Sequence, residues 1–138
     1  MTNIYARVAA LGMVCGLRTM MGPALVAQDA SPKIRGLFLV LSVGELVADK
    51  LPTTPSRLLP GPLLGRAVAG GAVGYVLCRR SHGSPWVGAL LGAAEAVAGA
   101  FGGGYARRAL GARLRVPDPA VALLEDALAF GVGWHFVQ

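Results

Sequence analysis

Two pairs of acidic residues interrupt apolar stretches of the chain. Glu45 and Asp49 are four residues apart, so on a helix they lie on one face, one turn apart. Glu125 and Asp126 are adjacent in a second apolar stretch near the C-terminus. Carboxylates are costly in lipid and usually face a protein interior or a watery cavity there. These four residues therefore predict a shared acidic site that binds an ion or exchanges protons.

Five further charged residues offer a structural alternative, in which each acid pairs with a base and locks two helices together. The candidate bases are Arg18, Lys50, Arg66 and Arg108, all within or beside the apolar stretches. Glu95 lies in mid-stretch without a charged neighbour in the sequence, and pairing with Arg18 is its favoured interpretation. An anion bound by Arg18 is the weaker alternative for that residue.

Enzymatic motifs are missing from the sequence. It has no nucleophile elbow, phosphate-binding loop or zinc-ligand spacing, so we expect neither an enzyme nor a cofactor, and no metal is identified. Cys15 and Cys78 lie in apolar runs without a CxxC motif, which predicts buried, inert thiols. His82 and His135 are expected at the membrane interface.

The composition is that of a helical membrane protein. Hydrophobic residues make up 54% of the chain and charged residues only 14%, where a soluble domain has about a quarter. The 20 glycines favour close packing of membrane helices. A soluble bundle is the alternative, but polar faces to solubilise it are missing. We expect a single domain over residues 1–138, multi-pass in the inner (cytoplasmic) membrane. The net charge of +6 comes from basic residues between apolar runs, which fits membrane flanks better than nucleic acid.

The apolar runs predict an all-α polytopic fold with about five transmembrane helices. The first is expected to be a retained helix with a kink at Pro23, rather than a cleaved signal peptide. The proline-rich segment 52–62 is not expected to be regular helix, and we expect it on the membrane surface or dipping into it. The predicted helices cover Ile4–Ala27, Gly36–Leu51, Leu63–Cys78, Trp86–Leu110 and Ala120–Val137.

Weak internal symmetry suggests an inverted repeat, in which helices 1–2 and 4–5 flank helix 3 and a site lies between the halves. Two stripes of small residues predict helix packing within the chain or between copies. The first is Gly70 with Gly74, and the second is Gly88, Gly92, Ala96 and Ala100. With five crossings, the flanking basic residues divide eight to four in favour of the N-terminal side. This bias predicts a cytoplasmic N-terminus and an external C-terminus.

Four short motifs stand out in the sequence: Gly16-Leu17-Arg18, the block from Glu45 to Pro52, the helix start at 60–71 and the late block 124–129. In these motifs the chain resembles the small bacterial membrane proteins grouped as Domain of Unknown Function forty-one twenty-six. It departs at 104–108, where the family tends to have a lysine. The resemblance implies a membrane protein and the same acidic residues, but no activity. A weaker similarity, by analogy alone, is to small cation/proton exchangers with two Glu-x-Gly-Asp-Lys-Thr repeats.

Together these features predict a small membrane transporter or channel for an ion, with Glu45, Asp49, Glu125 and Asp126 as its site. The alternative is a non-transporting scaffold or lipid-binding protein whose acids are paired with arginines. The expected partners are the lipid bilayer, a small ion and further copies of the chain in a homo-oligomer, because five short helices form a thin wall around any pathway.

Overall fold

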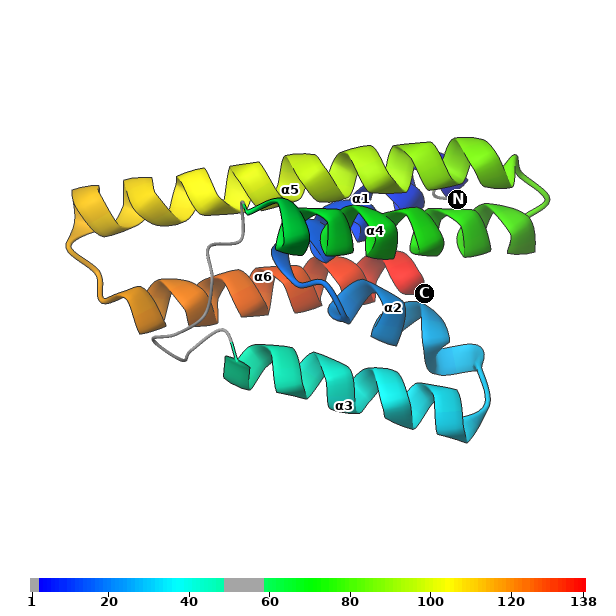
Figure 1. Ribbon diagram of the computed structural model, residues 1–138, viewed down its shortest axis with the longest axis horizontal. Coiled ribbons are helices and arrows are strands. Elements are labelled where there is room, and N and C mark those ends of the chain that lie inside the picture. The colour runs from blue at the N-terminus through cyan, green and yellow to red at the C-terminus, as the bar shows by residue number, and fades with distance from the viewer. Residues whose placement is uncertain (1–2, 49–58) are drawn as a thin grey trace.

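The computed structural model describes residues 3–48 and 59–138, which fold into helices without a strand (Figure 1). The expected all-α class is therefore confirmed. The elements are α1 (Ile4–Leu17), α2 (Met21–Val26), the 3-10 turn η1 (Ala27–Asp29), α3 (Pro32–Ala48), α4 (Pro60–Arg80), α5 (Pro85–Leu114) and α6 (Asp118–Val137). Asp49, Lys50 and most of the proline-rich segment lie outside the described residues.

The first predicted helix is broken, so the expectation of one kinked helix over Ile4–Ala27 is wrong. α1 ends at Leu17, and Arg18 takes an extended conformation with φ −140° and ψ 108°. Pro23 lies inside the first turn of α2, where a helix does not need the missing N–H group. The proline is therefore accommodated without a kink, and the helix breaks at Arg18–Met20 instead.

The chain reverses direction at this break. Val8 near the start of α1 lies beside Gly74, and the Val26 carbonyl at the end of α2 accepts a hydrogen bond from Arg80, so both contact the C-terminal half of α4. The Gly16 carbonyl instead contacts Arg66, near the start of α4. Figure 1 shows α2 running back alongside α1. We call the segment Ile4–Val26 the re-entrant hairpin and Arg18–Met20 its tip.

Close contact between small residues holds α1, α4 and α5 together. A Cβ atom at Gly74 would collide with the Gly88 carbonyl, and a Cβ at Gly16 would collide with the Ala96 carbonyl. Only glycine allows backbones to approach this closely. Both glycine stripes therefore pack within one chain. Val8, Leu11, Val73 and Leu77 fill the core beside them.

α6 closes the bundle on the other side of α1. The Arg7 guanidinium donates hydrogen bonds of 2.8 Å to the carbonyl oxygens of Phe136 and Val137. The two ends of the chain therefore lie at the same end of the bundle (Figure 1). The predicted placement of the two ends on opposite sides of the membrane stays a prediction, and their proximity at one end of the bundle argues against it.

α3 stands apart from this core. Among the described elements its backbone lies close only to α2 and η1, and none of its residues is buried. Its exposed apolar side chains include Leu37, Val40 and Val47. Such a surface is stable when lipid covers it, since lipid does not penalise exposed apolar groups.

Three helices, α4, α5 and the Pro119–Val137 part of α6, are long and apolar enough to cross a membrane, judged by length and composition. α1, with 14 residues, is about 21 Å long and falls short of the roughly 30 Å hydrocarbon core. The fold is thus that of an all-α membrane protein in which the tip of the re-entrant hairpin ends inside the bundle.

Candidate functional site

Glu45 reaches from α3 to the tip of the re-entrant hairpin. Its two carboxylate oxygens accept hydrogen bonds from the backbone N–H groups of Thr19 at 2.7 Å and Met20 at 2.8 Å. These amides come directly before α2, where N–H groups have no partner inside the helix. A carboxylate at this position also interacts favourably with the positive end of the helix dipole. Glu45 therefore caps α2 from another helix.

Arg66 makes the matching contact at the end of α1. Its guanidinium donates a 2.5 Å hydrogen bond to the Gly16 carbonyl, one of the carbonyls that α1 leaves unbonded at its C-terminus. The same guanidinium lies 4.0 Å from the Glu45 carboxylate. Both helix ends created by the break are thus bound by side chains of opposite charge. Arg66 is 4% exposed, so this pairing is shielded from the surroundings.

Arg18 and Asp126 form a second ion pair at the same tip. Arg18 is 1% exposed, and its Nε donates a 2.5 Å hydrogen bond to Asp126 Oδ1 on α6. Its Nη2 atom contacts the same carboxylate oxygen. The two acidic blocks therefore meet at one tip, one through α3 and the other through α6. We call Arg18, Glu45, Arg66 and Asp126 the helix-break cluster.

Glu125 lies beside this cluster but points in another direction. Successive helix residues are about 100° apart, so Asp126 faces α1 while its neighbour Glu125 faces α5. A Cβ atom at Gly103 would lie 3.1 Å from Glu125 Oε1. Glu125 is half-buried, and it borders the cluster on the side of α5.

Two predicted partners lie elsewhere. Glu95 packs against Gly12 of α1, because a Cβ atom added at Gly12 would lie 3.0 Å from the Cβ atom of Glu95. Glu95 forms no ion pair with any described residue. The expected pair between Glu95 and Arg18 is therefore wrong, because Asp126 binds that guanidinium. Arg108 is exposed on α5 and pairs with no acid in the described ranges. Asp49 and Lys50 fall in the undescribed segment.

Backbone groups are the part of the site that sequence reasoning missed. The Thr19 and Met20 amides and the Gly16 carbonyl become ligands only because the helix breaks between them. One signal in the sequence was Arg18 itself, a charged residue in the middle of an apolar run five residues before a proline. That combination fits a break in a membrane helix as well as a kink.

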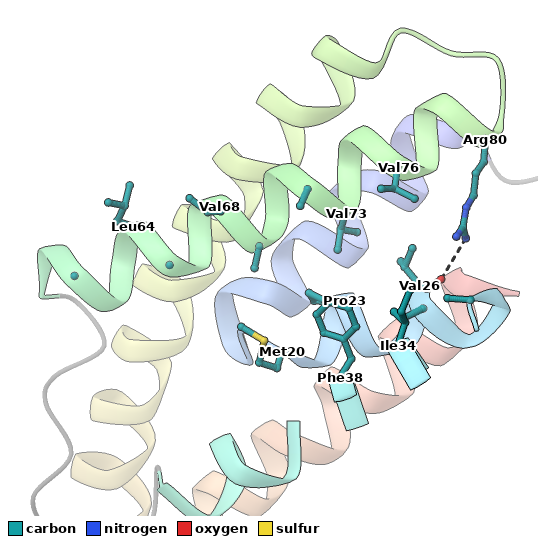
Figure 2. A pocket seen from close by; sticks show the side chains of 16 residues that line it. Met20, Pro23, Val26, Ile34, Phe38, Leu64, Val68, Val73, Val76 and Arg80 are labelled. Carbon is teal, nitrogen blue, oxygen red and sulfur yellow. Dashed lines mark hydrogen bonds between the residues drawn. The ribbon is translucent and has the colours of Figure 1, made fainter. Parts of the chain in front are cut away.

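A second feature is an apolar groove between α4 on one side and α2, η1 and α3 on the other (Figure 2). Its volume is about 670 Å³, within the usual range for ligand pockets. Met20 at the hairpin tip lies along it, and Arg80 marks its far end. This groove could not be predicted from the sequence, because its walls come from three separate segments.

Comparisons with known proteins found no relative from which a function could be inferred, so the helix-break cluster and the apolar groove are the basis for the proposals below. No protein-family model matches this chain, and no curated protein or solved structure gives a significant match. The resemblance to the small bacterial membrane family therefore stays a prediction.

Proposed function

We propose that the protein is a small membrane transporter for an ion and that the helix-break cluster, with Glu125 beside it, is the binding site. The observation that carries the proposal is the capping of a broken helix by Glu45, a carboxylate from a different helix. Discontinuous helices whose ends meet charged groups inside the bundle are the usual construction of ion and substrate sites in secondary transporters.

The free-energy cost of the helix-break cluster supports a functional role. Charged side chains inside a membrane protein usually mark ion or proton pathways. Buried ion pairs add little net stability compared with well-packed apolar residues. Two such pairs at one helix break are therefore a poor way merely to hold helices together.

The contacts of Glu45 suggest how ion binding is coupled to movement. A proton or cation on this carboxylate would compete with the Thr19 and Met20 amides and with Arg66 for its oxygens. Since α3 otherwise contacts only α2 and η1, weakening these bonds would release α3 from the hairpin tip. Binding at Glu45 would then change access to the site.

A second candidate function is supported by the same pairs. Asp126 has Arg18 as its partner and Glu45 has Arg66, which is the arrangement expected of a non-transporting scaffold. In that case the cluster only fixes the hairpin between α3, α4 and α6. The two functions differ in whether loss of an acid changes ion flux or only stability.

Three further properties stay predictions: residence in the inner membrane, assembly into a homo-oligomer and an inverted repeat. The packing gives the repeat no support, since α5 contacts α6 whereas α1 does not contact α3. The charge bias no longer supports a cytoplasmic N-terminus. Among the described flanking residues, the end of the bundle with both chain ends carries Arg7, Lys33, Arg35, Arg79 and Arg80, and the opposite end carries Arg107, Arg108, Arg113 and Arg115. Lys50 and Arg57, which the earlier count included, lie outside the described residues.

Flux measured in liposomes tests the proposal. The protein is reconstituted with an internal pH dye, and a series of cations and anions is applied outside. Glu45→Gln and Asp126→Asn keep the shape of each side chain but remove its negative charge. Asp29→Asn is the matched control, because Asp29 is 89% exposed and remote from the tip. We expect an ion-dependent flux that the first two variants lose and the control retains.

The transport proposal would be contradicted by an absence of flux together with a loss of stability in the variants. If no ion moves through the wild type, and Glu45→Gln and Asp126→Asn lower its thermal stability in detergent, the acids are helix clamps. The scaffold function would then replace transport.

A further inference from the structure

The apolar groove combines a long hydrocarbon surface with a basic end. One wall is a stripe of α4 from Gly61 to Arg80, a distance of about 28 Å at the rise of an α-helix. Ile34 and Phe38 of α3 form the opposite wall, with Pro23 and Val26 of the hairpin at its base (Figure 2). Apart from Arg80, every side chain that lines the groove is apolar.

Small residues keep the groove open along α4. A Cβ atom at Gly61 or Gly65 would meet no atom within 4 Å, and both residues line the groove. The backbones of α3 and α4 do not approach each other closely, and the described contact between the two helices is that of Glu45 with Arg66 at the hairpin tip. Between them, the apolar groove is not filled by the described residues.

The basic end of the groove defines the charge of its occupant. Arg80 is 46% exposed, and its Nη1 donates a 3.2 Å hydrogen bond to the Val26 carbonyl while lying 3.8 Å from Asp29. A guanidinium has five N–H donors, and Arg80 uses one of them in a hydrogen bond with the described residues. Arg79 adjoins it, and Lys33 and Arg35 flank Ile34 in the first turn of α3. This end of the groove thus has four basic residues and one exposed carboxylate, that of Asp29.

We propose that the groove binds one anionic phospholipid, with an acyl chain between α3 and α4 and the phosphate at Arg80. The apolar walls match the hydrocarbon, and the unused guanidinium donors match the phosphate oxygens. Arg80 ends a helix long enough to span the membrane, which places it at the depth of lipid headgroups. None of the four residues of the helix-break cluster lines the groove, although Met20 borders both, so this proposal does not depend on ion transport.

Charge also argues against a second copy of the chain in the groove. The chain has a net charge of +6, and its basic residues gather at the helix ends. A parallel copy would bring its own cations toward those at the basic end, and like charges repel. An anionic headgroup instead neutralises them.

The test is lipid binding to the purified full chain in detergent, followed by native mass spectrometry. The probes are dioleoyl phosphatidylglycerol, which is anionic, and dioleoyl phosphatidylcholine, which has no net charge. We expect one saturable phosphatidylglycerol per chain and at least fivefold weaker binding of phosphatidylcholine, since one basic residue near anionic lipid accounts for about this factor.

Two variants with matched controls separate the parts of the site. Arg80→Gln is expected to bring phosphatidylglycerol down to the level of phosphatidylcholine, while Arg113→Gln, which removes an exposed charge on α5, leaves binding unchanged. Gly65→Leu fills the groove and is expected to abolish binding of both lipids. Gly111→Leu also extends into open space, but away from the groove, and is expected to bind like the wild type.

Three outcomes would overturn the proposal. Equal affinity for the two lipids would remove the role of the basic end. Wild-type binding by a folded Gly65→Leu would assign the lipid to the general surface. A dimer that Gly65→Leu converts to a monomer, with unchanged lipid binding, would make a second copy the occupant.

Discussion

At the scale of residues, the pair of Arg18 and Asp126 joins the tip of the hairpin to α6 across 108 positions of sequence. The arginine is 1% exposed and the aspartate side chain 15%. Removal of one partner of a buried ion pair leaves an uncompensated charge, which is far more damaging than loss of both.

Asp126→Ala is therefore expected to destabilise the protein by about 3 kcal/mol or more. The double variant Arg18→Met with Asp126→Leu, which removes both charges and keeps the volume apolar, is expected to recover most of this loss. Thermal unfolding in detergent, followed by circular dichroism, measures both. A double variant as unstable as Asp126→Ala would show that the charges themselves hold the tip in place.

At the scale of elements, the antiparallel pair of α4 and α5 depends on facing glycines. A Cβ atom at Gly88 would collide with the Gly74 carbonyl and lie 2.5 Å from Cys78 Sγ. Neither neighbour is free to withdraw, since one is helix backbone and the other is a buried side chain. The spacing of the two helices is thus fixed by the absence of two side chains.

Gly88→Ala is expected to separate α4 from α5 and to lower stability by about 1–3 kcal/mol, as overpacking does. Gly65→Ala is its control on α4, because a Cβ there meets nothing within 4 Å and alanine is the better helix former. Melting temperatures of the two variants provide the comparison. Equal melting temperatures would contradict the close approach of the two backbones.

The elements also show where sequence reasoning succeeds. Apolar runs located α3, α4, α5 and α6, and the glycine spacing identified the packing stripes, because both are local patterns. The reversal at Arg18–Met20 was missed, since hydropathy does not record the direction in which a helix runs. The sequence did not identify the partners of Arg18, Glu45 and Arg66, because each partner is distant in the sequence and hydropathy does not show which distant segments meet.

At the scale of the whole molecule, the re-entrant hairpin explains why the two ends of the chain lie at the same end of the bundle (Figure 1). Arg7 binds the carbonyls of Phe136 and Val137, so the start of α1 and the end of α6 are adjacent. A first helix that crossed completely would have separated the two ends by the thickness of the bilayer.

Reporter fusions in bacterial cells test this arrangement. Alkaline phosphatase is active only outside the cytoplasm, and green fluorescent protein exported through the general secretory route is dark there. We expect fusions at the N-terminus and at the C-terminus to give the same answer with both reporters. Opposite answers at the two ends would mean that α1 and α2 together cross the membrane.

The dependence of the hairpin tip on distant partners bears on how the protein is made. Arg18 and the open helix ends at the tip are bound by residues of α3, α4 and α6. Each of these partners comes later in the sequence than the hairpin, and Asp126 of α6 is the most distant of them. The hairpin tip therefore reaches its complete set of contacts only after α6 has been translated.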